Sequence, residues 1–482
     1  MKRLEFLQHA GLIGSGLLFG ATDGFGLDVA TNAQTSASQS AFRSQRPAPG
    51  SRNFSSAAIE KAILEFKSRI KDEELAWLFE NCFPNTLDTT VFIKSKSEKP
   101  DSYVITGDID AMWLRDSTAQ VWPYLPFMSA DPALQRLIAG VINRQTQCIL
   151  KDPYANAFYD DDSKVSHWKD DLTEMKPGIH ERKWEIDSLC YPIRLAYHYW
   201  KITKDVTPFD DSWKSAIAST LRVFREQQRK ENQGPYSFQR NTSWATDGVP
   251  LGGYGYPVKP VGLICSMFRP SDDATIFPFL IPSNFFAVVT LKHASEMVAA
   301  ISKDQALASE LKQLSIEVDG ALKKHSTVTH PEFGIIYAYE VNGLGSYNLM
   351  DDANVPSLLS LPYLGAVSQD DPVYQNTRRF LLSENNPFFF KGRVASGIGG
   401  PHVGVDMIWP LSIIMRGLTS NDETEIKECI RVLKSTHAGT GFMHEAFHKD
   451  DANRFTRKWF AWANTIFGEF LWKVYKERPH LL

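Results

Sequence analysis

The 482-residue sequence has few cysteines and little net charge. None of its five cysteines forms a Cys-x-x-Cys pair or has a histidine partner at zinc spacing, so we expect no zinc site. The odd count leaves at least one thiol free unless it pairs between molecules, and we expect most to be buried free thiols. A net charge of -4 argues against nucleic acid or an anionic membrane surface as a partner.

A calcium signature is also missing, although acid-rich runs are present. These runs are Asp160-Asp161-Asp162, Asp170-Asp171 and Asp351-Asp352. None has the spacing of an EF-hand loop or a histidine partner at zinc spacing, so solvated turns are the better interpretation. The sequence therefore predicts no catalytic metal and no cofactor.

The N-terminus has the pattern of a bacterial-type export signal. Two basic residues precede a short apolar run at 10–21, which is too short to span a bilayer. We expect residues 1–33 to be a signal peptide and residues 34–53, rich in Ser, Gln, Ala and Pro, to be a flexible lead-in. No lipid-anchor cysteine follows, and we expect no later stretch to be apolar enough to span a membrane. The mature protein is therefore expected in the periplasm or outside the cell, without stable membrane insertion.

The periodicity of residues 54–482 predicts one all-α domain. Twelve helices are expected, at 56–69, 117–127, 132–150, 185–201, 212–231, 284–301, 305–324, 356–364, 373–383, 402–417, 423–436 and 454–476. They form six neighbouring pairs. The connections 151–184 and 232–283 are long, with room for short strand pairs, and loops of that length in a compact domain are usually functional.

One stretch, Thr106 to Leu125 (TGDIDAMWLRDSTAQVWPYL), gathers three carboxylates, one arginine and two tryptophans. Asp116 is expected in the N-cap region of a helix, with Trp113 and Arg115 on the loop just before it. An aromatic face, a guanidinium and a carboxylate at one helix start suit an uncharged, hydroxyl-rich ligand such as a sugar. A capped helix with one ion pair and two packing tryptophans is the alternative, and this stretch alone leaves both open.

Acids or their amides recur near the start of the second helix of each pair. They are Asp116, Asp187, Asp352 with Asn354, Asp406 and Asn453, and more loosely Asp272 and Asp273 upstream of the sixth helix. Capping, worth about 0.5–2 kcal/mol per helix, explains acids at any helix but not a preference for the even-numbered ones. A ring of six inner helices whose N-termini open into one cup explains that preference.

Four segments resemble glycoside hydrolase family 125. They are TGDIDAMWLRDSTAQVWPYL, KWEIDSLCYPIRLAYHYWK at 183–201, FRPSDDATIFPFLIPSN at 268–284 and GFMHEAFHKDDANRFTRKWFAWANTIFGEFL at 441–471. They span nearly the whole mature chain in the family's order. The resemblance implies an (α/α)6 barrel with long loops around the cup. It also implies an exo-acting α-1,6-mannosidase that inverts configuration without a metal, on mannose-containing glycans such as N-glycan or mannan fragments.

Inverting hydrolysis needs a carboxylic acid and a carboxylate base roughly 6.5–9.5 Å apart. The resemblance places the acid in Ser271 to Ala274 and the base at Glu445. Asp272 is preferred to Asp273 as the acid, because adjacent side chains point in different directions and only one can face the bond. From the residues alone, a solvated turn at the aspartate pair is the competing interpretation, whereas apolar flanks favour a cleft wall for Glu445.

Six residues are expected to bind the sugar, each with a purely structural role as the alternative. They are Trp113, Arg115, Asp116, Asp187, His402 and His444. Trp113 would stack on a pyranose face, and Arg115 with Asp116 would clamp hydroxyl groups. Asp187 is preferred to Glu185, because two residues two positions apart on a helix point about 200° apart.

Two other classes of function remain open at this stage. The first is another toroid enzyme, such as a glucosidase, a trehalase-like hydrolase or a polysaccharide lyase. A lyase would need a positive cup for uronates, which the acids here oppose. The second is a glycan-binding protein of an uptake system, for which Asp272→Asn and Glu445→Gln would leave the activity, binding, intact.

Overall fold

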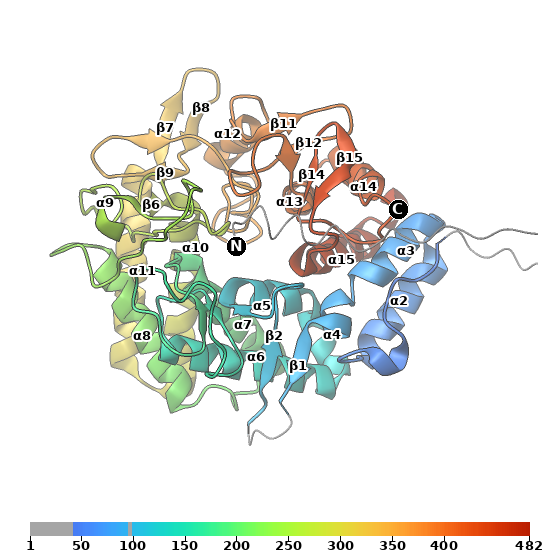
Figure 1. Ribbon diagram of the computed structural model, residues 1–482, viewed down its shortest axis with the longest axis horizontal. Helices are drawn as coiled ribbons and strands as arrows, with labels where there is room; N and C mark the ends of the chain where they lie inside the picture. Colours follow the sequence, from blue (N-terminus) through green and yellow to red (C-terminus); the bar gives the residue numbers. More distant parts are fainter. Residues whose placement is uncertain (1–41, 95–98) are drawn as a thin grey trace, which may run out of the picture. The chain divides into compact units, whose positions relative to one another are not determined.

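The computed structural model describes residues 42–94 and 99–482, of which Ser44–Leu482 form one compact unit. Within this unit the helices form two concentric rings, the (α/α)6 barrel that was expected (Figure 1). The predicted signal peptide at 1–33 and the first part of the lead-in, residues 34–41, lie outside the described residues.

The inner ring is built from helices that pack side by side around the barrel axis. They are α5 (Leu114–Val121), α7 (Ile186–Thr203), α10 (Ile281–Met297), α13 (Pro410–Leu418) and α15 (Ala461–Glu477). α5 packs on α7, α7 on α10 and α13 on α15, and α15 closes the ring against α5. The remaining inner place is taken by the turns of residues 353–367. These turns are fixed to α7 by a hydrogen bond from Tyr191 to the Val355 carbonyl, 2.9 Å long.

The outer ring surrounds these helices. It consists of α2 (Ala57–Arg69), α3 (Glu73–Cys82), α6 (Pro132–Lys151), α8 (Asp211–Gln227), α11 (Gln305–His325), α12 (Pro372–Leu381) and α14 (Glu423–Ser435). Shorter helical turns are η1 (Pro49–Ser51), α4 (Asn85–Thr89), η2 (Trp122–Ala130), α9 (Pro250–Gly253), η3 (Val298–Ser302) and η4 (Pro479–Leu481).

The two rings begin their helices differently. Every outer helix follows a Ser or Asp whose side chain accepts a backbone N–H: Ser56, Asp72, Asp131, Asp210, Asp304, Asp371 and Asp422. The inner helices follow Trp113, Glu185, Leu280, Trp409 and Phe460, none of which makes a side-chain cap. Side-chain capping, the alternative explanation for acids near the inner helix starts, is therefore not what those acids do, because the side-chain caps belong to the outer ring.

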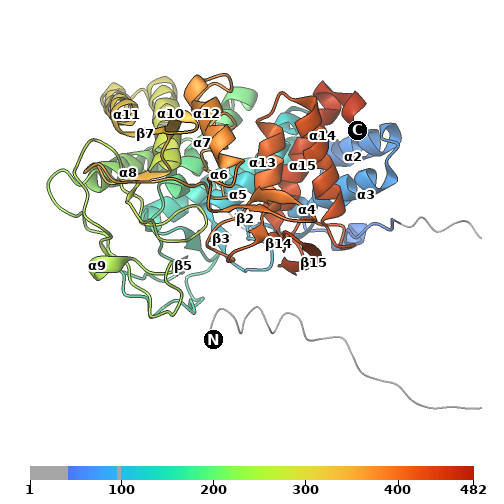
Figure 2. The same cartoon turned by 90° about the horizontal axis from the view of Figure 1, so that it is seen from above.

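Short antiparallel strands line the side of the barrel where the inner helices begin (Figure 2). Two-stranded sheets pair β1 (Val91–Ile93) with β2 (Ser102–Val104), β7 (Thr327–His330) with β8 (Gly334–Tyr337), and β11 (Phe389–Lys391) with β12 (Ser396–Ile398). Three-stranded sheets join β3 (Met112–Trp113), β4 (Ala157–Phe158) and β5 (Ile179–Glu181); β6 (Phe279–Leu280), β9 (Glu340–Val341) and β10 (Tyr347–Asn348); and β13 (Met407–Ile408), β14 (Ala446–His448) and β15 (Asp451–Thr456). Strands β3, β6 and β13 lead into α5, α10 and α13, so they set where those helices start.

Three predicted helices differ from the structure, and α3 was not predicted. The segments 402–417 and 454–476 become helical only at Pro410 and Ala461, because their first residues pair as β13 and β15. The helix predicted at 356–364 is absent from this described segment. There the buried carboxylate of Asp351 accepts the backbone N–H groups of Leu358 (2.8 Å) and Leu359 (3.0 Å), which holds the chain in turns.

The end of the predicted flexible lead-in is ordered. The Arg46 guanidinium donates to Asp88 Oδ2 at 2.7 Å and to Glu60 Oε2 at 3.0 Å. The Gln45 backbone N–H donates to Asn81 Oδ1 at 2.9 Å. The expectation of flexibility therefore does not hold for residues 44–53, which pack on α2, α3 and α4.

Two expectations about burial have different outcomes. All five cysteines are free and buried, as expected for most of them. The expectation that no later stretch is apolar enough to cross a membrane is wrong for one segment. Ile281–Ser302 is long and apolar enough to do so, judged by length and composition only. This segment is α10 with η3, which packs between α7 and α11 in the barrel wall, so its apolar side chains serve the core.

Candidate active site

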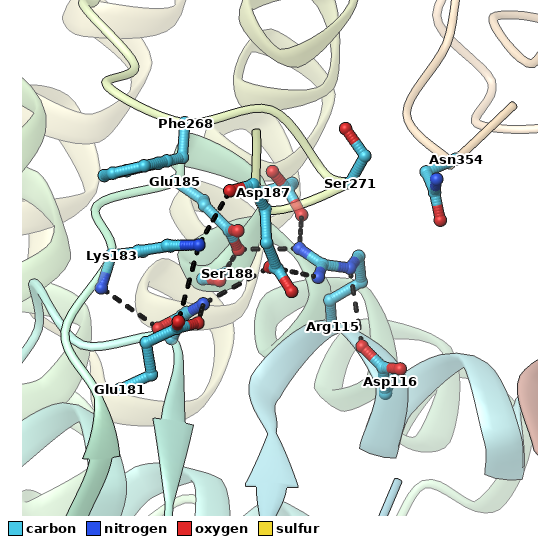
Figure 3. A network of polar contacts seen from close by, with 12 residues as sticks. Arg115, Asp116, Glu181, Lys183, Glu185, Asp187, Ser188, Phe268, Ser271 and Asn354 are labelled. Carbon is cyan, nitrogen blue, oxygen red and sulfur yellow. Dashed lines mark hydrogen bonds and ion pairs between the residues drawn. The ribbon is translucent and has the colours of Figure 1, made fainter. Parts of the chain in front are cut away.

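Arg115 stands at the centre of the cup, one residue into α5 and 3% exposed. Its Nη1 lies 2.6 Å from Glu185 Oε2 and 3.2 Å from Asp187 Oδ2, and its Nη2 lies 3.1 Å from Asp272 Oδ1 (Figure 3). Its Nε lies 3.4 Å from Asp116 Oδ2. One guanidinium thus joins four carboxyl groups from α5, the start of α7 and the loop before β6.

The acids around Arg115 outnumber its single charge, and their pKa values shift accordingly. Burial raises the pKa of Asp116 and of Asp187 to about 6, although Arg115 opposes the shift. Burial also raises the pKa of Glu185 well above its ordinary value. Burial acts in the same direction on Asp272, but Arg115, Lys183 and Glu185 together outweigh it, and the pKa of Asp272 is lowered. The cluster therefore holds protons close to neutral pH, with Glu185 protonated before Asp272.

Several buried polar atoms of this cup have no hydrogen-bond partner in the described structure. They are Asp116 Oδ2, Glu185 Oε1, Asp187 Oδ1 and the indole Nε1 of Trp113. Buried polar atoms are nearly always paired, so such a group marks a place for a polar ligand. Hydroxyl groups suit it because each can donate to a carboxylate and accept from an N–H.

The adjacent aspartates have different surroundings. Asp272 has a positive φ of 64°, and its side chain is 21% exposed toward the cup. The Asp273 side chain is fully buried, accepts from Thr246 Oγ1 at 2.7 Å and lies 3.7 Å from Nδ1 of His402. Burial acts to raise the pKa of Asp273, but His402, Thr246 and Arg269 together outweigh it, and the pKa is lowered. Asp272 is therefore the carboxyl that faces the cup, whereas His402 pairs with the neighbouring Asp273.

Glu445 lies in a second contact group, just before β14. The side chain is 11% exposed, and Oε1 lies 3.4 Å from Nη1 of Arg457. The same guanidinium donates to the Thr106 carbonyl at 3.0 Å and pairs with Asp108. Arg457 thereby fixes Glu445 to the loop that leads into β3, the strand that carries Trp113 and precedes Arg115.

Two predicted sugar-binding residues have structural contacts instead of open faces. The His444 ring stacks on Phe455 at 3.8 Å, and its Nδ1 lies 2.9 Å from the Lys458 carbonyl. Burial lowers the pKa of His444, so the ring is neutral. Trp113 is only 6% exposed and meets His180 edge to face, which leaves its partnerless N–H, more than its ring face, for a ligand.

The site also contains residues that the sequence interpretation missed. The expectation that only one of Glu185 and Asp187 faces the cup does not hold, because both side chains contact Arg115. Glu185 is the extended residue before α7, so the helical angle between the two does not apply. Asn156 Nδ2 approaches Asp272 Oδ1 at 3.4 Å, and Lys183 donates to the Asp272 carbonyl at 2.8 Å. The available signal in the sequence was the run Lys183-Trp-Glu-Ile-Asp, in which charged residues alternate with apolar ones.

One acid and one amide expected near inner helix starts lie outside the cup network. Asp406 has a φ of 65° and pairs with Lys449 at 2.7 Å, before β13. Asn453 is an exposed residue of β15. Across the described residues no group of three or more His, Cys, Asp or Glu side chains is arranged to hold a metal ion.

Comparisons with known proteins point in one direction. The sequence profile of the metal-independent α-mannosidases, glycoside hydrolase family 125, matches residues 72–472. A solved structure of a metal-independent α-mannosidase from Streptococcus pneumoniae, in a non-productive complex with α-1,6-mannobiose, is 42% identical. The match covers 88% of this chain and 100% of that chain, with a TM-score of 0.85.

Two further similarities extend the comparison. The "Meiotically up-regulated gene 157 protein" of Schizosaccharomyces pombe (strain 972 / ATCC 24843) is 43% identical over 456 residues, which are 91% of this chain and 89% of the relative. A bacterial glucoamylase complexed with acarbose is 14% identical with a TM-score of 0.51, over 82% of this chain and 55% of that chain. At that identity the second similarity concerns the fold alone.

Proposed function

Because the chain belongs to glycoside hydrolase family 125, the metal-independent α-mannosidases, we propose that this glycoside hydrolase releases terminal mannose from α-1,6-linked mannosides with inversion. The observation that carries the proposal is the cup around Arg115, whose buried carboxylates keep partnerless oxygens beside one another. Such a site binds a ring of hydroxyl groups without needing a charged ligand. The related Streptococcus pneumoniae enzyme binds α-1,6-mannobiose, which supports the linkage.

Asp272 is the proposed general acid. It is the member of the aspartate pair that faces the cup, and it must be protonated when the glycosidic oxygen leaves. In the free enzyme Arg115 keeps the pKa of Asp272 low, whereas burial raises the pKa of Glu185, which contacts the same guanidinium. Glu185 is therefore the proton carrier in the free enzyme, and substrate hydroxyls that draw Arg115 away from Asp272 would favour moving that proton onto Asp272.

Glu445 is the proposed general base. Arg457 orients its side chain from one side, and the remaining oxygen is free to take a proton from the attacking water. Asp272 comes from the loop before β6, whereas Glu445 comes from the loop before β14. Acid and base thus come from different segments of the cup wall, and inversion requires their carboxyl groups to stand roughly 6.5–9.5 Å apart, with room for water between.

Other cup residues are proposed to hold the terminal mannose. Asp187 and Asp116 would accept hydroxyl protons through their partnerless oxygens, and the Trp113 N–H would donate to a hydroxyl oxygen. His402, fixed beside Asp273, would line the same pocket, and His444 would back the Glu445 loop. Each of these contacts depends on hydrogen bonds rather than charge, as recognition of a neutral sugar requires.

Exo action and export complete the proposal. The long loops 151–184 and 232–283 are joined by paired backbone hydrogen bonds between Leu172 and Gln239, at 2.8 and 3.2 Å. This junction would close the cup behind the first sugar. Export is proposed from the N-terminal signal pattern. N-terminal sequencing of protein collected from the periplasm or medium should show cleavage within residues 21–33, and an intact Met1 would count against it.

The test is hydrolysis of α-1,6-mannobiose followed by proton NMR, with and without a chelator. We expect β-mannose first, at a rate that the chelator leaves unchanged. Asp272→Asn and Glu445→Gln should each lower turnover by at least about 10³-fold and leave mannobiose binding within a few-fold. Release of α-mannose first would mean retention and would require a nucleophile in place of the base.

A further inference from the structure

Asp272 has a backbone conformation that requires support. Its φ of 64° lies in the left-handed region, which is unfavourable for a residue with a Cβ atom. Its N–H donates to the Arg269 carbonyl at 2.9 Å, which closes a tight turn. Its own carbonyl accepts from Nζ of Lys183 at 2.8 Å. A charged donor therefore holds the backbone carbonyl of Asp272, and the conformation of that backbone sets the direction of the Asp272 side chain.

Lys183 is committed to this task. The side chain is 3% exposed, and besides the Asp272 carbonyl its Nζ contacts Asp247 Oδ1 at 2.7 Å. The same Nζ lies 3.4 Å from Glu181 Oε1 (Figure 3). It also lies over the ring of Phe268 at 5.0 Å. Two of its three protons are donated in hydrogen bonds, to Asp247 and to the Asp272 carbonyl, and Glu181 pairs with the same ammonium by charge. The contacts of this buried ammonium are therefore with protein acceptors that fix the Asp272 peptide.

Arg240 connects this lysine to the two long loops. Its guanidinium forms a two-pronged contact with Asp171, at 2.8 and 2.6 Å, and lies 3.7 Å from the ring centre of Trp168. It also contacts the two carboxylates that Lys183 uses, Glu181 at 2.9 Å and Asp247 at 3.1 Å. The buried network thus runs from loop 151–184, through loop 232–283, to the backbone of Asp272.

We propose that Lys183 is a positioning residue for the general acid and that Arg240 couples its position to the loops over the cup. The inference rests on the proposed function, because it concerns the aim of the acid in that reaction. Without the ammonium, the Asp272 peptide loses its charged donor and can relax from the left-handed region. The carboxyl then turns away from the leaving oxygen while the sugar-binding acids around Arg115 stay in place.

The test compares two substrates on purified full-length protein. α-1,6-Mannobiose has a poor leaving group that needs the acid, whereas 2,4-dinitrophenyl α-mannoside has a leaving group that needs no proton. For Lys183→Met we expect kcat on mannobiose to fall about 10²-fold with KM within threefold, because general acid catalysis contributes about 10²–10⁴-fold. On the dinitrophenyl mannoside the loss should stay below about tenfold.

Three other variants frame the result. Asp272→Asn should show the same selectivity more strongly, and Glu445→Gln should lose both substrates, because water must attack in each case. Lys164→Met should leave both rates unchanged, since Lys164 pairs with Asp110 and Asp160 at the surface.

Equal loss of both substrates in a folded Lys183→Met protein, or a change in KM alone, would overturn the inference. If Lys183→Met does not fold, Asp247→Asn removes the strongest carboxylate contact of the lysine and should give the same selectivity, and equal loss there overturns it too. Wild-type protein that cleaves the dinitrophenyl mannoside but not α-1,6-mannobiose counts against the proposed linkage alone. The comparison of Lys183→Met with the wild type is then repeated with a mannobiose of the linkage that the protein does cleave, in place of the α-1,6-linked one.

Discussion

Replacing Asp187 with Asn should stabilise the protein at alkaline pH while it destroys activity. Burial raises the pKa of this fully buried carboxyl from 3.8 to about 6. The folded state therefore binds the proton more tightly than the unfolded chain. This contribution to stability is complete below about pH 4 and is lost as the pH rises through 6. Asparagine resembles the protonated acid at every pH, so it avoids the loss.

The magnitude follows from the shift. A difference of about two pKa units corresponds to about 3 kcal/mol at 1.36 kcal/mol per unit. We therefore expect the free energy of unfolding of Asp187→Asn to exceed that of the wild type by up to about 3 kcal/mol at pH 8, and by close to nothing at pH 4. The hydrogen bond from Arg115 reduces the gain if the amide oxygen holds it less well.

Urea unfolding at the two pH values measures this difference, and hydrolysis of mannobiose measures the functional cost. Turnover should fall at least about 10²-fold, because the amide replaces one of the two accepting oxygens of the carboxylate with an NH2 donor. Asp370→Asn, an exposed change, should stay within about 0.5 kcal/mol at both pH values. An Asp187→Asn protein that is less stable than the wild type at pH 8 would show that the Arg115 pair outweighs burial, and would refute the reasoning.

Three other changes test separate parts of the structure. Trp113→Phe removes a partnerless indole N–H, so KM for mannobiose should rise about five- to tenfold with kcat within twofold, and a loss of stability alone would mean that the ring only packs. Asp351→Asn should cost about 1–3 kcal/mol in urea unfolding at pH 6, below the pKa of about 8 to which burial raises this acid, because both oxygens of the acid accept backbone N–H groups and one of these would face an amide donor; an unchanged midpoint would contradict this. A thiol reagent should label none of the five cysteines in native protein and all five in concentrated urea, since burial raises every thiol pKa, that of Cys148 to about 12; fast labelling of native protein would show an open thiol.

The sequence predicted the helices whose apolar residues recur along one face. Most outer helices and α7 begin within a residue or two of their predicted starts, because hydrophobic period and capping residue agree there. The segment 356–364 shows the limit of that rule, since Asp351 offers its backbone two strong acceptors outside any helix. The two-residue strands β3, β6 and β13 are too short to leave a period-two pattern, so the starts of three inner helices were poorly placed.

The site was predictable where its residues are neighbours in sequence. Arg115 and Asp116 stand in one motif, Asp187 came from the acids near helix starts, and the role of Asp272 came from the family resemblance. Glu185 was set aside because its segment was assumed to be helical, although it is extended. The partners of Lys183 could not be predicted, because its contact with Asp247 joins residues 64 positions apart and depends on how two long loops fold together.

The uncapped starts of the inner helices tie the stability of the inner ring to the contents of the cup. A bound sugar whose oxygens accept backbone N–H groups at these starts acts as a shared external cap. Hydrogen exchange should therefore slow at the first turns of α5 and α7 when mannose is added. The first turns of α6 and α8, which Asp131 and Asp210 already cap, should exchange at the same rate with and without it. Amide protection would in this way map the inner wall of the barrel from the ligand outward.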